Sequence, residues 1–193
     1  MDIFLLHGIT KSINPTEYYA EIVNGIRNYL PINSGVRKWI PTIDDIRWHA
    51  IDYSHILAKK EEQIFKWMSK FWHQRSRKWG CDYLGDILAL SQKDSDLEPG
   101  DAYYDIFDLL TSKYDSVNAL ATDSKKIIIG HSLGGQLAYV LTWRRHFDTI
   151  VTLGAPITWF SIKHKNFGKM NPNLRLWYNF WKKGDRVASV ISE

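Results

Sequence analysis

A serine flanked by glycines occupies residues 130–134, which read Gly-His-Ser-Leu-Gly. A nucleophilic serine must stand in a sharp, strained turn, where side chains two residues before and after it would collide. Gly130 and Gly134 remove those side chains, so Ser132 is a candidate nucleophile. The N–H of Leu133 is then a candidate donor to a developing oxyanion. The alternative is that this stretch is a glycine-rich turn that serves packing or binds a phosphate. Residues 130–134 lack the lysine and the spacing of a phosphate-binding loop.

The elements around this turn must form a strand and a helix. Ile127, Ile128 and Ile129 are three consecutive β-branched residues, as in a strand buried on both faces of a parallel sheet. Residues 136–145 carry apolar side chains at helical spacing. The pattern therefore predicts a strand, a sharp turn and a helix that begins directly after Ser132.

Three motifs in this order resemble the α/β-hydrolase superfamily, and its lipase and esterase members in particular. They are residues 4–8 (Phe-Leu-Leu-His-Gly), 130–135 (Gly-His-Ser-Leu-Gly-Gly) and 152–156 (Thr-Leu-Gly-Ala-Pro). The resemblance implies an α/β fold with a mostly parallel central sheet flanked by helices. We expect a single domain over residues 1–193 with a helical insertion at about 54–122, and without the last strand and loop of the family. The resemblance also implies a serine hydrolase that cleaves carboxylic esters, either lipid esters or small acyl esters.

The resemblance assigns an oxyanion loop to the residues after the first strand. His7 and Gly8 match the family's His-Gly, with Gly8 allowing the turn and the N–H of Ile9, or else of Thr10, as the second oxyanion donor. His7 is expected to be structural, with a side chain that hydrogen-bonds the loop. His131 sits where lipase-like turns often carry a structural histidine.

A serine nucleophile also needs a base and an acid that orients the base. Asp185 is the predicted acid, because Gly-Asp-x-Val after the last strand looks like the family's acid position; the alternative is a solvated aspartate paired with Arg186. Asp148 precedes its strand and is expected at the wrong edge of the sheet. The family's order places the catalytic histidine after the acid, yet no histidine follows Asp185 up to Glu193. The base is then His164, or a histidine beyond Glu193, or one supplied by a partner chain.

The other strands and helices are predicted from short apolar runs and from apolar side chains at helical spacing. We expect strands at 3–6, 46–53, 149–154 and 174–181, and helices from Pro15 to about Tyr29 and from about Asp101 to Thr122. His49 is expected on the surface or in a groove, because it alternates outward from Trp48.

Composition favours one soluble, intracellular domain. The chain has 193 residues, 45% of them apolar, and a formal charge of +4, with no arginine cluster that would suit nucleic acid. Cys81 is its only cysteine, so no intrachain disulfide forms, and no metal or cofactor is expected. With no signal or spanning segment apparent, we expect a cytoplasmic protein.

Residues 59–79 are basic and carry apolar and aromatic side chains near one helical face. Such a helix can lie on a membrane surface or cover an apolar substrate site, but aromatic stripes at this spacing more often face a core. Two alternatives to the esterase therefore stay open. One is an inactive relative that binds a lipid or a protein partner, and the other is a membrane-surface module. The oligomeric state, the acyl chain length and the leaving group are not predicted.

Overall fold

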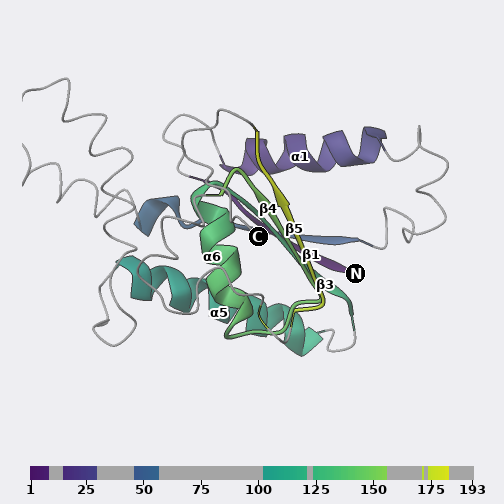
Figure 1. Cartoon of the computed structure of the whole chain (residues 1–193). Helices are drawn as coiled ribbons and strands as arrows, with labels where there is room; N and C mark the ends of the chain where they lie inside the picture. Colours follow the sequence, from purple (N-terminus) through teal and green to yellow (C-terminus); the bar gives the residue numbers. More distant parts are fainter. Residues whose placement is uncertain are drawn as a thin grey trace, which may run out of the picture.

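The computed structural model of the chain describes residues 1–8, 15–29, 46–56, 102–120, 124–155, 171 and 174–182, and the fold is given for these residues. Five parallel strands form one sheet in the order β2-β1-β3-β4-β5 (Figure 1). They are β1 (Asp2–Leu6), β2 (Arg47–Ile51), β3 (Lys126–His131), β4 (Thr149–Leu153) and β5 (Leu176–Phe180). The predicted α/β fold with a parallel central sheet is confirmed.

The register of the sheet brings the carboxyl ends of all five strands to one edge. Leu6 at the end of β1 lies opposite Ile51 of β2 and Gly130 of β3. Leu153 at the end of β4 lies opposite Phe180 of β5. In parallel α/β sheets this edge is where ligands bind, so the residues that directly follow the strands are the ones to inspect.

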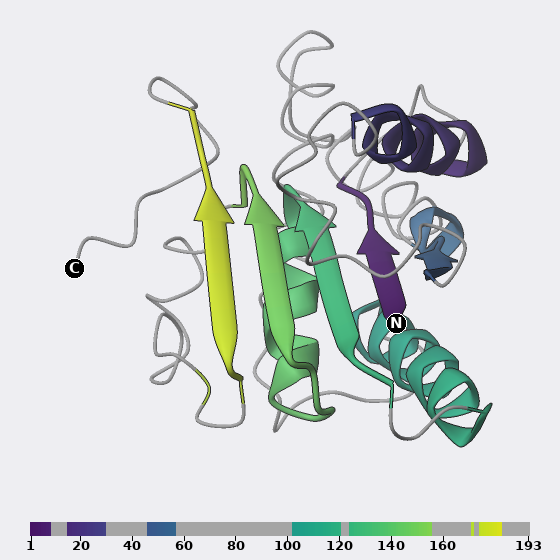
Figure 2. The same ribbon diagram turned by 90° about the vertical axis from the view of Figure 1, so that its right-hand side faces the viewer.

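Within the described residues, α5 (Ala102–Leu120) and α6 (Leu133–Thr142) cover one face of the sheet and α1 (Pro15–Tyr29) covers the other (Figures 1 and 2). Figure 2 shows α6 behind β3 and β4, whereas α1 lies beside β1 at the upper right. Proline is the first residue of α1, where its missing N–H removes no helical hydrogen bond.

Alternating side chains of β1 pack into two hydrophobic cores, one on each face of the sheet. Phe4 and Leu6 belong to the larger cluster, with Ile128 of β3 and buried residues of α5 and α6. Ile3 and Leu5 point to the opposite face and pack with Tyr19 of α1. All five residues of β1 are buried, as expected for a strand covered on both faces.

The predicted strands and helices that fall on described residues are present, with boundaries that differ by a few residues. The predicted helix at about 101–122 is α5, and the predicted strands at 46–53 and 174–181 are β2 and β5. Of the predicted insertion at about 54–122, residues 57–101 and 121–122 lie outside the described part. The basic aromatic stretch Lys59 to Trp79 falls within that range, so its role stays a prediction.

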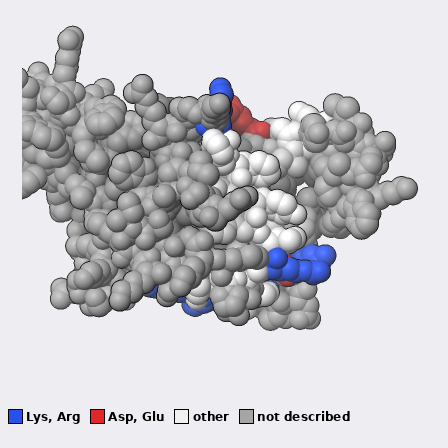
Figure 3. All heavy atoms as spheres, viewed as in Figure 1, with Lys and Arg blue, Asp and Glu red and all other residues white. Residues whose placement is uncertain are grey.

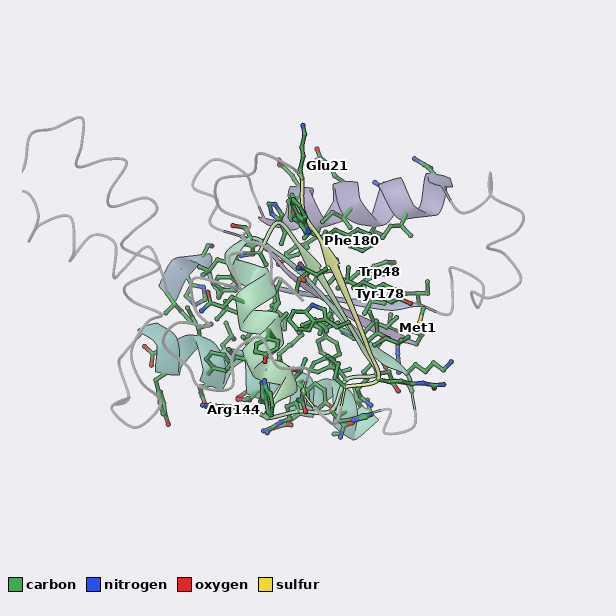
Figure 4. All side chains as sticks on the ribbon, in the orientation of Figure 1. Met1, Glu21, Trp48, Arg144, Tyr178 and Phe180 are labelled. Atoms are coloured by element: carbon green, nitrogen blue, oxygen red, sulfur yellow. The ribbon has the colours of Figure 1, made fainter. Side chains whose placement is uncertain are left out.

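Strand β5 carries exposed apolar side chains along one face. Leu176, Tyr178 and Phe180 are 44%, 48% and 56% exposed. Figure 4 shows Tyr178 on the same side of the sheet as Trp48 and α1. Figure 3 shows that the described surface in this view is mainly uncharged, with Lys and Arg at its lower right. Among the described helices, only α1 lies on this face of the sheet.

A buried carboxylate joins three segments at the amino end of the sheet. Asp2 is fully buried and accepts two hydrogen bonds of 2.8 Å from the Arg47 guanidinium and one from Ser124 Oγ. The ring of His49 lies 2.8 Å from the same carboxylate through Nε2. His49, expected on the surface or in a groove, is partly buried, because Asp2 holds its ring, which is 16% exposed.

The Asp2 network is expected to make the free energy of unfolding depend on pH in acid. Burial alone raises the pKa of Asp2, but hydrogen bonds from Arg47, Ser124 and His49 and the charge of Arg47 outweigh it and lower the pKa to about 2. The folded-state pKa is below the unfolded value, so this contribution is present above about pH 4 and is lost as the pH falls toward 2. Its size is about 2 kcal/mol.

Urea unfolding of the wild type and of Asp2→Asn at pH 7 and pH 3 measures this effect. We expect the wild type to be more stable by about 2 kcal/mol at pH 7 and the gap to shrink at pH 3. A gap of equal size at both pH values would show that the carboxylate charge of Asp2 does not stabilise the fold.

Candidate active site

Ser132 is the single residue between the end of β3 at His131 and the start of α6 at Leu133. Its backbone has φ 52° and ψ −125°, and it is the one residue other than glycine with a positive φ in the described part of the chain. Such a conformation costs on the order of 1–3 kcal/mol and persists only where the surroundings impose it. Here the N–H of Ser132 donates to Leu153 O at 2.8 Å, and its carbonyl accepts from Gly135 N at 3.0 Å.

The two glycines of the turn are sterically required, as the sequence predicts. A Cβ on Gly130 would lie 2.3 Å from the Gly134 carbonyl oxygen, and a Cβ on Gly134 would lie 2.3 Å from the His7 carbonyl oxygen. Both distances are far below van der Waals contact and both involve backbone atoms. Their absent side chains let α6 start directly against β1 and β3.

The predicted oxyanion donors lie at the start of α6 and in the loop after β1. The N–H of Leu133 is the first of α6 and has no carbonyl partner within that helix. The partial positive charge of a helix amino terminus favours a developing negative charge there. Gly8 comes so close that a Cβ on it would lie 2.7 Å from Ser132 Cβ and 3.3 Å from Ser132 Oγ. Ile9, the predicted second donor, lies outside the described residues, as does its alternative Thr10.

His7 is buried between the loop and the end of β2. Its Nδ1 contacts the Gly8 carbonyl oxygen, and its Nε2 lies 3.3 Å from Asp52 Oδ1. The ring stacks on Tyr53, with centroids 4.4 Å apart and planes 5° apart, and the Tyr53 hydroxyl donates to the His7 carbonyl. The His7 side chain thus hydrogen-bonds the start of the loop, and its structural role stays a prediction.

A tyrosine of α1 ties the ends of β1 and β2 together. The Tyr19 hydroxyl accepts a hydrogen bond from His7 N at 3.2 Å and donates to Ile51 O at 2.9 Å. Burial raises the pKa of the Tyr19 hydroxyl. The hydroxyl therefore stays protonated and able to donate.

Asp52, Tyr53 and Tyr19 are site residues that sequence reasoning missed. Asp52 and Tyr53 directly follow β2 at the edge that holds Ser132. A polar residue directly after a parallel strand is the signal that would have found Asp52. Tyr19 lies in the helix predicted from Pro15 to about Tyr29, and nothing in its spacing indicates the hydrogen bonds that it makes.

His131 lies at the same edge, on the surface. Its ring is 6.2 Å from the ring of Tyr18 of α1, in a tilted arrangement. It is exposed, whereas Ser132 beside it is half-buried.

The predicted acid and base, Asp185 and His164, lie outside the described residues. Both assignments therefore stay predictions. Asp148 is described, and its Oδ2 accepts a hydrogen bond from Lys126 N at 2.9 Å, at the amino end of the sheet. Its predicted place at the wrong edge is confirmed.

Metal binding and membrane spanning find no support in the described residues. No group of three or more His, Cys, Asp or Glu among them could hold a metal ion. In the same part of the chain, no helix is both long and apolar enough to cross a membrane.

The sequence and the fold were also compared with known proteins. No protein-family model, no curated protein and no solved structure matches the chain. What the site does must therefore be argued from its own geometry.

Proposed function

We propose that this protein is a serine hydrolase of the α/β-hydrolase type that cleaves carboxylic esters through an acyl-enzyme on Ser132. The observation that carries the proposal is the strained backbone of Ser132, at φ 52°, between a buried parallel strand and a helix amino terminus. Backbone strain of this kind is found where function requires a residue to be presented in one orientation. A turn that served packing alone would carry glycine at this position at lower conformational cost.

The proposed reaction divides the chemistry between the turn and its surroundings. Ser132 Oγ attacks the ester carbonyl while a base takes its proton, and the carbonyl oxygen becomes an oxyanion. The N–H of Leu133 and an N–H of the loop after Gly8 stabilise that charge. The alcohol leaves with a proton from the base, and water then hydrolyses the acyl-enzyme. His164 is proposed as the base and Asp185 as the acid, with a histidine beyond Glu193 or from a partner chain as the alternative base.

Apolar side chains at the same edge support an ester with an apolar acyl group. Phe180 ends β5 opposite Leu153, and Trp181 follows it; they are 56% and 47% exposed. Large aromatic surfaces at the sheet edge that holds the nucleophile favour apolar substrates over charged ones.

Intact-mass measurement after exposure to a fluorophosphonate tests the proposal. We expect a single covalent adduct on the wild type and none on Ser132→Ala. Ser116→Ala is the matched control, because Ser116 is an exposed serine of α5 that donates to Lys113 O; it should be labelled like the wild type. Absence of an adduct on the wild type would contradict the proposal and favour a relative that binds a lipid or a protein without turnover.

A further inference from the structure

We infer that Tyr19 and Tyr53 are positioning residues for Ser132. Their hydroxyls hold the backbone of His7 from opposite faces of the sheet and so keep Gly8 against the nucleophile. Both tyrosines act through the backbone, while their rings lie in the two hydrophobic cores. The inference rests on the proposed function, because that function makes turnover depend on the orientation of the Ser132 hydroxyl.

The backbone of His7 lies just beyond the last residue pairs of β1. The strand pairs with β2 and β3 as far as Leu6. His7 is the next residue and is 1% exposed, so its N–H and its carbonyl need partners inside the protein. The N–H donates to the Tyr19 hydroxyl at 3.2 Å, and the carbonyl accepts from the Tyr53 hydroxyl. The two tyrosines therefore pair both backbone groups of His7.

The Tyr19 hydroxyl bridges β1 and β2 where their own pairing ends. It accepts a hydrogen bond from His7 N and donates one to Ile51 O at 2.9 Å. A hydroxyl can donate and accept at the same time, whereas a phenylalanine ring at this position could do neither. Tyr19 is 4% exposed and packs with Ile3 and Leu5 on the face that α1 covers. This packing fixes the place of the hydroxyl.

Tyr53 approaches His7 from the face that α5 and α6 cover. It is fully buried in the cluster that holds Phe4 and Leu6. Its ring stacks on the ring of His7, with centroids 4.4 Å apart, and its hydroxyl donates to the His7 carbonyl. The same carbonyl oxygen borders the start of α6, since a Cβ on Gly134 would lie 2.3 Å from it. The His7 backbone is therefore held on both sides of the sheet.

The position of His7 determines the position of Gly8, which borders the nucleophile. A Cβ on Gly8 would lie 2.7 Å from Ser132 Cβ and 3.3 Å from Ser132 Oγ. A shift of the His7 backbone would move Gly8 and change the space in which Oγ can turn. Attack on a carbonyl requires the reacting atoms about 3–3.5 Å apart and aligned, and a displacement of about 1 Å can lower the rate by about 10²-fold.

Replacement of each tyrosine by phenylalanine tests the inference, because the ring stays and only the hydroxyl is lost. We expect Tyr19→Phe and Tyr53→Phe to lower kcat for p-nitrophenyl butyrate by about tenfold or more. KM should change little, because the substitutions affect the alignment of the nucleophile and leave the binding surface in place. A fall of kcat/KM that came from KM alone would overturn the inference.

Tyr114→Phe is the matched control. Tyr114 of α5 is 5% exposed, and its hydroxyl donates to His146 O at 2.7 Å, just before β4 at the amino end of the sheet. The variant loses the same kind of hydrogen bond to a backbone carbonyl, far from Ser132. We expect it to lower the midpoint of thermal unfolding, as the other two do, and to keep the kcat of the wild type. If Tyr19→Phe and Tyr53→Phe also kept that kcat, neither tyrosine would position the nucleophile.

Hydrogen exchange of the His7 amide, followed by NMR in a Ser132→Ala background, gives a readout that does not depend on turnover. We expect the amide to be protected when Tyr19 is present, to lose protection in Tyr19→Phe and to keep it in Tyr114→Phe. Equal protection in all three proteins would overturn the inference even if a fluorophosphonate labels Ser132 in the wild type. Loss of protection in Tyr19→Phe, without labelling of the wild type, would support the hold of Tyr19 on His7 while rejecting the hydrolase.

Discussion

Replacement of Ser132 by alanine is expected to lower ester turnover by about 10³-fold or more while the protein keeps its fold. The hydroxyl is the proposed nucleophile, so its loss removes the covalent route and leaves only binding and oxyanion stabilisation. Alanine keeps the Cβ of serine, so the strain at φ 52° is the same in both proteins. We expect kcat/KM for p-nitrophenyl butyrate to fall and the midpoint of thermal unfolding to stay nearly constant.

The unfolding measurement separates a lost nucleophile from a lost fold. Ser116→Ala on α5 serves again as the control and should retain full turnover. If Ser132→Ala kept the turnover of the wild type with an unchanged unfolding midpoint, Ser132 would have no part in the reaction.

Gly134→Ala is expected to destabilise the protein by about 3 kcal/mol or more, which is a large part of the 5–15 kcal/mol typical of a domain. The added methyl would lie 2.3 Å from the His7 carbonyl oxygen and 2.5 Å from the Leu6 carbonyl oxygen. Both atoms belong to the backbone at the end of β1, which is hydrogen-bonded on both sides and cannot retreat. We expect a low soluble yield and a lower urea midpoint.

Gly25→Ala is the matched control for the same chemical change. Gly25 lies in α1, and nothing comes within 4 Å of a Cβ built on it. Alanine is a better helix former than glycine, so this variant should gain about 0.5–1 kcal/mol. Equal effects of the two substitutions would show that the contact with β1 does not determine the requirement for Gly134.

The central strands and the turn at Ser132 could be predicted because their signals are local. Three isoleucines followed by a glycine-flanked serine indicate a buried strand and a sharp turn without reference to any other part of the chain. The collisions that Gly130 and Gly134 avoid are also visible in the spacing alone, although the sequence does not identify the atoms that would collide. For Gly134 these belong to β1, far away in the sequence.

The polar contacts around the site could not be predicted, because they join residues distant in sequence. His7 and Asp52 are 45 residues apart and meet only because β2 lies beside β1. The contact of His49 could not be predicted for the same reason, since its partner Asp2 is 47 residues away in the sequence and buried. Alternation along a strand predicts which face a side chain takes, but not whether that face holds a carboxylate.

The place of β1 between β2 and β3 has a consequence for the newly made chain on the ribosome. Of the five described strands, β1 is synthesised first, and its partner β3 ends at His131, 125 residues after Leu6. At about 5–20 residues per second, the apolar strand Asp2–Leu6 waits on the order of 6–25 s for that neighbour. During this interval, the edge of β1 that pairs with β3 in the finished sheet can pair with other chains. We therefore expect chaperones that bind apolar segments to protect β1 until β3 has been made.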